Sequence, residues 1–244
     1  MMANPVLTRS LNGIYSETSA AGVEIPRLGT ERMTVEGTMA RTVQLFVVLL
    51  ITATATWVTG LAVLAFPAMF IGLGLALWAS FSRTVRPGVI VAYAAVQGVF
   101  LSGLSQLFES FYPGIVMNAV IATLATAGSI FVAYNRGWVK VTNKFRKMMT
   151  FALVGYMGFA LINLGVGMFT GNSVYGSSFG WIAALIGVGL ASFTLLLDLA
   201  DIEEGVGVGA PKDMEWRAAF GLMVSLVWMY TEMLRLLAIL RGDD

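Results

Sequence analysis

The chain has 244 residues, of which 57% are hydrophobic and 12% charged, and its mean hydropathy is +0.80. A soluble domain has about 25% charged residues, so this chain cannot cover itself with a polar surface, and its composition predicts an integral membrane protein. The chain contains no cysteine and no histidine, so it is expected to have no disulfides, no thiolate or imidazole metal site, no cofactor and no enzyme activity. Its basic residues are confined to short loops, so no nucleic-acid partner is expected.

Residues 1–40 contain only short apolar stretches, none long enough for the hydrophobic region of a signal peptide. These residues are expected to form a polar cytoplasmic tail, and residues 41–244 the transmembrane domain. Near the end of the tail, Thr34 is a candidate N-cap for a helix that leads into the first span.

The segment from Thr42 to Ser82 has no charged residue and is long enough for two spans of about 20 residues each. The expected turn between them is Trp57–Gly60, and Pro67 then lies in the first turn of the second span, where proline is tolerated. Five more apolar segments follow, and the chain is therefore predicted to be an all-α protein with seven transmembrane helices. The five segments are Gly88–Leu107, Gly114–Tyr134, Met148–Phe169, Gly180–Asp198 and Arg217–Leu240.

The distribution of Lys and Arg orients the spans, because basic residues favour the cytoplasmic side. With the N-terminus inside, the cytoplasmic segments contain every basic residue except Arg235 and Arg241, which lie toward the outer end of the last span. We therefore expect a multi-pass protein of the cell (plasma) membrane with a cytoplasmic N-terminus and an external C-terminus.

The last two apolar segments each carry an acid, Asp198 and Glu232. An ionisable group within a span is costly and is a candidate functional site that faces protein or water. At about 1.5 Å per residue, Asp198 falls near the cytoplasmic mouth, while Ser225 and Glu232 share one face of the last helix, with Glu232 deeper. Asp201 follows Asp198 in a stretch, Asp201–Glu204, that is expected to be a solvated acidic loop.

Each acid also has a purely structural interpretation. Asp198 can cap the cytoplasmic end of its helix, or it can latch that end to a basic partner such as Arg83 or Arg86. Glu232 can form a neutral pair with Arg235, whose long side chain can extend toward the outer interface. Both interpretations stay open at this point, because a charge held by a breakable partner also suits a gate.

Three stretches carry a family resemblance when they are read together in their order. They are AYAAVQGVFLSGLS at Ala92–Ser105, LLLDLADI at Leu195–Ile202 and MLRLLAILRGDD at Met233–Asp244. From about Val35 to its end, the chain resembles the Bax-inhibitor (transmembrane Bax-inhibitor-motif) family, and within it a bacterial branch. The resemblance implies a pH-sensitive calcium leak in which two aspartates, on spans six and seven, share a proton.

The two aspartate positions of that family fall differently on this chain. The first falls on Asp198. The second falls on Ser225 if the C-terminal motif is the anchor, and on Glu232 if the triplet Tyr230–Glu232 is matched instead. The first register needs no gap, so the two-carboxylate pair is not reproduced in place, and an acidic partner of Asp198 must be Glu232 or a loop acid such as Asp201.

The function expected from the sequence is a membrane cation leak through a seven-helix protein whose last helix is central. Carboxylates suit hard cations such as Ca²⁺, so Asp198 and Glu232 are the expected calcium-binding residues. Ser225, Asp201 and Arg235 complete the expected path or gate, and the partners are the lipid bilayer and calcium ions. The alternative is a non-conducting regulatory protein that binds other membrane proteins, such as a quality-control protease.

The charge asymmetry makes a testable prediction about the C-terminus. A reporter fused after Asp244 should report an external location, because an odd number of spans separates it from a cytoplasmic N-terminus. A fusion after Lys140, in the most basic segment, is the matched control and should report the cytoplasm. A cytoplasmic signal from both fusions would remove one span from this scheme.

Overall fold

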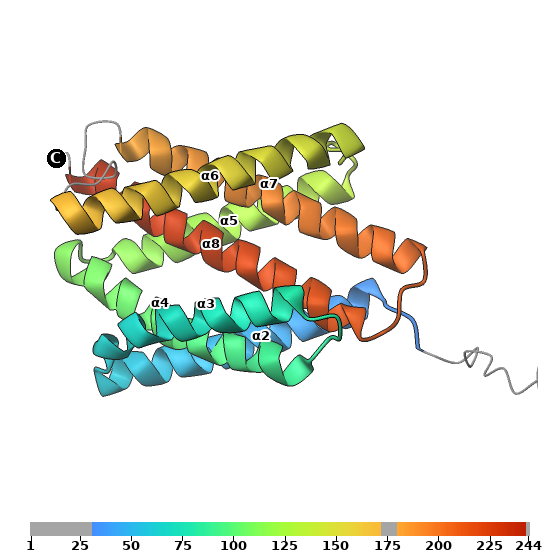
Figure 1. Cartoon of the computed structure of the whole chain (residues 1–244), viewed down its shortest axis with the longest axis horizontal. Coiled ribbons are helices and arrows are strands. Elements are labelled where there is room, and N and C mark those ends of the chain that lie inside the picture. Colours follow the sequence, from blue (N-terminus) through green and yellow to red (C-terminus); the bar gives the residue numbers. More distant parts are fainter. Residues whose placement is uncertain (1–30, 172–179, 243–244) are drawn as a thin grey trace, which may run out of the picture. The chain divides into compact units, whose positions relative to one another are not determined.

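A computed structural model describes residues 31–171 and 180–242, and residues 1–30 of the tail expected at 1–40 lie outside this range (Figure 1). The chain divides into two units, Met1–Arg32 and Met33–Asp244, and the described helices belong to the second. Its elements are α2 (Val35–Thr59), the 3-10 helix η1 (Ala62–Leu64), α3 (Ala65–Phe81), α4 (Pro87–Phe111), α5 (Ile115–Asn135), α6 (Asn143–Thr170), α7 (Gly180–Gly207) and α8 (Met214–Gly242). Within the described residues seven helical segments are long and apolar enough to cross a membrane, which confirms the predicted fold class.

The first two spans meet at the predicted turn. Gly60 ends α2 with a left-handed φ of 68°, and its N–H donates to the carbonyl oxygens of Thr56 and Trp57. A residue without a Cβ adopts this conformation at little cost. At the other end of α2, the Thr34 hydroxyl accepts a hydrogen bond from the Gly37 N–H at 2.9 Å, so Thr34 is the N-cap that the sequence predicted. The helix therefore begins at Val35, inside the stretch assigned to the tail.

Helix α7 is longer than predicted and corrects the interpretation of its acids. It continues through Asp198 to Gly207, so Asp198 does not cap a helix end. The stretch Asp201–Glu204, expected to be a loop, is helical. The apolar pattern ends near Asp198, but a helix that leaves the apolar layer needs no apolar side chains to continue.

Helix α8 occupies the centre of the bundle, as predicted. It packs against α2, α4, α5 and α7. In the view of Figure 1 it runs between α5, α6 and α7 on one side and α2, α3 and α4 on the other. Met223, Met229 and Leu234 are completely buried along its length. Peripheral helices instead expose large apolar side chains, among them Phe81 and Phe151, which suits contact with lipid rather than water.

The start of α2 is tied to the start of α8 by a buried carboxylate. Glu215 is only 2% exposed, and its Oε1 accepts hydrogen bonds from the Thr34 N–H at 3.2 Å and the Thr34 hydroxyl at 3.1 Å. A Cβ on Gly37 would lie 2.0 Å from the same oxygen, so the glycine makes room for the carboxylate. A negative charge also interacts favourably with the N-terminus of a helix. Glu215 thus caps α2 from a neighbouring helix.

This cap predicts a specific loss of stability. Glu215→Ala leaves two donors of Thr34 without their acceptor and should lower the free energy of unfolding by about 1–3 kcal/mol. Glu36→Ala, which removes an exposed acid from the first turn of the same helix, is the control and should change stability by about 0.5 kcal/mol or less. Thermal unfolding in detergent measures both, and equal losses would contradict the cap.

Candidate functional site

Asp198 and Ser225 meet at the interface of α7 and α8. The Ser225 hydroxyl donates a hydrogen bond to Asp198 Oδ2. Ser225 is 2% exposed and Asp198 is half-buried. A Cβ on Gly221, one turn before Ser225, would lie 3.1 Å from Asp198 Oδ1, so the absence of a side chain there lets the carboxylate approach α8. The two positions that the family resemblance singled out are therefore in direct contact.

Glu232 lies further along the same face of α8 and is surrounded by hydrogen-bond donors. Its Oε1 accepts from the Tyr156 hydroxyl at 2.8 Å and from the Trp228 indole N–H at 3.0 Å. Its Oε2 accepts from the Arg235 guanidinium at 2.8 Å. Glu232 is 2% exposed, whereas the Arg235 side chain is 34% exposed. The pair that the sequence offered as the structural interpretation is present, and a tyrosine of α6 and a tryptophan of α8 complete it.

A glycine of α7 allows this cluster to form. A Cβ on Gly187 would lie 2.6 Å from the Tyr156 hydroxyl and 2.7 Å from the Glu232 carboxyl carbon. Both polar groups therefore rest on the bare backbone of α7. Any larger residue at this position would push the tyrosine or the carboxylate away.

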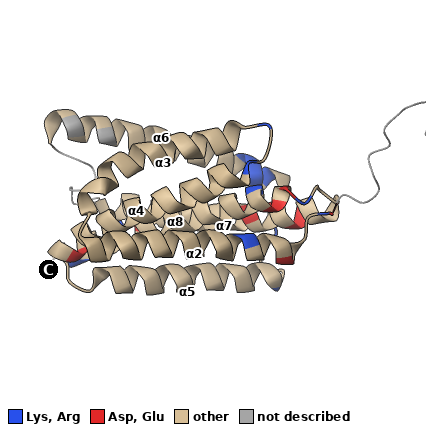
Figure 2. Ribbon diagram, turned by 90° about the horizontal axis from the view of Figure 1, so that it is seen from below, with Lys and Arg blue, Asp and Glu red and all other residues tan. Residues whose placement is uncertain are grey.

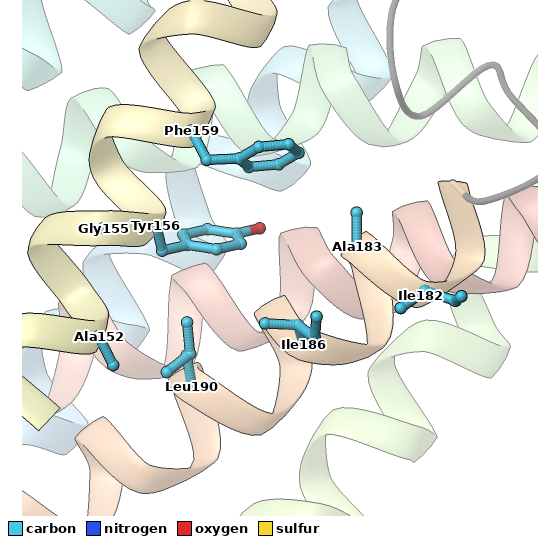
Figure 3. Close-up of a pocket in the computed structure, with 8 residues that line it drawn as sticks. All are labelled: Ala152, Gly155, Tyr156, Phe159, Ile182, Ala183, Ile186 and Leu190. Carbon is cyan, nitrogen blue, oxygen red and sulfur yellow. The ribbon is translucent and has the colours of Figure 1, made fainter. Parts of the chain in front are cut away.

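Next to the cluster, an apolar pocket of about 440 Å³ lies between α6 and α7. Figure 3 shows Tyr156 projecting from α6 into this space, with Ala183 and Ile186 of α7 opposite. Tyr156 thus lines the apolar pocket and also donates to the buried carboxylate of Glu232. Among the described residues, those that line the pocket carry no charge.

The polar positions of α8 are separated by packed apolar side chains. Met229 lies between Ser225 and Glu232 on α8 and is completely buried in a cluster with Leu195, Leu222 and their neighbours. Ser225 and Glu232 are seven residues apart, which corresponds to a rise of about 10 Å along α8. Because Asp198 lies beside Ser225, it is too far from Glu232 for the two acids to share one ion. The described residues contain no group of three or more Asp, Glu, His or Cys side chains that could hold a metal. Calcium binding by these two acids stays a prediction.

The acids beyond Asp198 form ion pairs at the end of α7. Arg146 of α6 contacts Asp201, and its other terminal nitrogen lies 3.1 Å from Glu204. The hydroxyl of Tyr134, on α5, donates to Glu203. The three side chains of Arg146, Asp201 and Glu204 are between 31% and 68% exposed, so solvent weakens these pairs.

The structure does not bring the expected latch arginines to Asp198. The Arg86 guanidinium lies over the Trp78 ring, 5.6 Å from its centroid, and Arg83 is exposed. The arginine that does join the α3–α4 connection to α8 is Arg217, which donates to the Ser82 carbonyl. In the described part of the chain, the polar contact of Asp198 is with Ser225 instead.

A family model described as Bax inhibitor 1 like matches residues 4–242. The chain belongs to the Bax inhibitor 1 like family. This confirms the resemblance, while the bacterial branch stays a prediction. A search of curated proteins finds no match.

Because the chain belongs to the Bax inhibitor 1 like family, the Asp198–Ser225 contact is the part of the site to compare with the positions that the family resemblance singled out. The register that needed no gap put the family's two acidic positions on these two residues, and they are hydrogen-bonded across α7 and α8. Sequence reasoning missed Tyr156 and Gly187 at the deeper site. The apolar pattern of α6 gives no sign of which face turns inward, so nothing marked this tyrosine as the partner of an acid on α8.

The Glu232–Arg235 pair predicts non-additive effects on stability. Arg235→Gln strands a buried carboxylate and should lower the free energy of unfolding by up to about 3–5 kcal/mol. The double variant Glu232→Gln with Arg235→Gln should recover much of that loss, because no charge is left unpaired. Thermal unfolding in detergent measures the cycle, and additive losses would contradict the pair. Arg241→Gln is the control, since Arg241 is exposed and donates to the Pro113 carbonyl.

Proposed function

We propose that this protein is a cation leak with calcium as its permeant ion, and that the Asp198–Ser225 contact forms its cytoplasmic gate. The single observation that carries the proposal is the direct contact between Asp198 of α7 and Ser225 of α8, the two positions on which the gap-free register of the family resemblance places the paired acids. Carboxylate and hydroxyl oxygens are ligands for hard cations, and acidic side chains line the paths of cation channels.

The second support is a line of polar side chains inside an apolar bundle. Ser225 and Glu232 are both 2% exposed on the central helix, where apolar residues would pack at lower cost. Polar residues inside a membrane domain mark ion or proton pathways. The completely buried Met229 between them makes this arrangement a closed form, in which an apolar barrier separates two polar sites.

The third support is the distribution of charge along the bundle. Figure 2 shows that the coloured Lys, Arg, Asp and Glu segments gather mostly at one end of the helices. This is the end where α7 carries Asp201 and Glu204, exposed beyond Asp198. We assign this end to the cytoplasm of a cell with the protein in its plasma membrane, because basic residues favour that side. Asp201 and Glu204, which continue α7 directly beyond Asp198, would then raise the local concentration of cations at the mouth.

The chemistry of the gate permits two substitutions with opposite expected effects. Asp198→Asn keeps an oxygen that accepts from Ser225 but removes the charge, so calcium uptake into proteoliposomes should fall about tenfold, the effect of losing roughly 1.4 kcal/mol of attraction. Ser225→Ala keeps the charge but removes the hydrogen bond between α7 and α8, so uptake should rise. Asp213→Asn removes an exposed acid from the α7–α8 connection and should leave uptake nearly unchanged.

The same assay decides between conduction and the regulatory alternative. Uptake no greater than that of empty liposomes, from protein that remains monodisperse, would contradict the leak and favour a protein that acts by binding other membrane proteins. Equal uptake by the wild type, Asp198→Asn and Ser225→Ala would contradict the gate. Release of an entrapped fluorescent dye should be absent throughout, since a nonspecific defect would pass both solutes.

A further inference from the structure

We infer that Arg235 is a built-in cation that occupies the deeper acidic site of the pathway and keeps permeant cations out of it. The inference rests on the proposed leak and names the residue that limits it. Nothing in the Asp198–Ser225 contact requires this role, because Arg235 acts at a different carboxylate, about two helical turns further along α8.

The geometry at Glu232 leaves little room for a second cation. Oε1 already accepts from two donors, Tyr156 and Trp228, and Oε2 accepts from Arg235. Calcium takes six to eight oxygen ligands, so it needs carboxylate oxygens that are not engaged by N–H or O–H donors. Of the three donors only Arg235 carries a charge, and its removal both frees Oε2 and leaves the site with a net charge of about −1.

The three donors differ in charge and in the way they reach Glu232. Tyr156 rests on the backbone of Gly187, and its ring is 5.6 Å from that of Trp228. Arg235 reaches Glu232 from one turn away on the same helix, and its side chain is 34% exposed. All three donors are half-buried, so Arg235 is distinguished from the two aromatic donors by its positive charge, which a permeant cation would have to displace from Oε2.

Stabilising helix α8 is not a sufficient explanation for the positive charge of Arg235 beside Glu232. An i,i+3 ion pair on an exposed helix surface contributes only about 0.2–0.5 kcal/mol. Here the carboxylate is 2% exposed, so its charge must be balanced by a partner or by an ion. The bound guanidinium balances it without an ion from solution, and this is the property that an experiment can separate from packing.

The test uses the absence of cysteine from the natural chain. Arg235→Cys in the full-length protein should raise calcium uptake into proteoliposomes about tenfold, because a unit charge at hydrogen-bond distance no longer competes with the ion. Treatment with 2-aminoethyl methanethiosulfonate attaches an ammonium group and should return uptake toward the wild-type rate. Methyl methanethiosulfonate attaches a neutral group and should leave uptake high.

Two matched variants separate charge from folding. Arg235→Lys keeps the cation and should take up less calcium than Arg235→Cys, whereas Glu232→Gln with Arg235→Cys has no acid to expose and should respond to neither reagent. If Arg235→Cys folds poorly, Arg235→Gln is the second variant without the charge and should also raise uptake above the wild-type rate. Absence of dye release and a monodisperse detergent-extracted protein show that increased uptake does not come from a damaged bilayer or unfolded chain.

The outcomes also separate this inference from the proposed leak. If Asp198→Asn lowers uptake but Arg235→Cys does not raise it, or if the cationic and neutral reagents act alike, the role of Arg235 is refuted and the leak stands. If neither the wild type nor Arg235→Cys takes up calcium, both are refuted. Increased uptake that only the cationic reagent reverses supports the inference.

Discussion

The constraint on which this structure depends is that polar groups inside an apolar bundle must find partners within the protein, because lipid offers none. Polar side chains at four positions along α8 form hydrogen bonds to residues of the helices around it. The contacts are Glu215 with Thr34, the N-cap of α2, Ser225 with Asp198 of α7, Tyr230 with Ser105 of α4 at 2.7 Å, and Glu232 with Tyr156 of α6. The hydrophobic effect does not drive helices together in lipid, where packing and interhelical hydrogen bonds do so instead, so these contacts contribute to which helices surround α8 and in what rotation.

The sequence was sufficient to predict the elements but not their mutual rotation. Long uncharged runs identify spans because hydropathy is a property of each segment, and a turn such as Gly60 has its own local signal. The sequence does not show which face of each helix turns toward its neighbours. A helix that is apolar all round has no amphipathic stripe to orient it, and this is why the partner of Glu232 on α6, Tyr156, and its contact surface, Gly187, could not be predicted. Arg235 and Trp228 could be, since helical spacing puts them beside Glu232 on the same helix.

The error at the end of α7 has a related cause. Asp201 and Glu204 interrupt the apolar pattern and therefore resembled a loop, but charged residues end a membrane span without ending a helix. Arg146 of α6 neutralises these two acids in part. This partner lies on another helix, so the sequence of α7 alone gives no sign of it. The candidate site was thus predicted as a set of residues, Asp198, Ser225 and Glu232 among them, while its division into two separate polar sites required the packing of Met229.

In the register without a gap, Ser225 stands where the family resemblance implies a second acid, and a serine there changes what holds α7 to α8. Two carboxylates in contact attract only if they share a proton, so such a contact depends on the proton concentration. A serine hydroxyl can donate to the oxygen of Asp198 whether or not that acid is ionised. The contact in this chain therefore persists without a shared proton, and the acid that still has to be balanced by a charge is Glu232. In the proposed leak, regulation by charge would therefore rest on the Glu232–Arg235 pair rather than on Asp198 and Ser225.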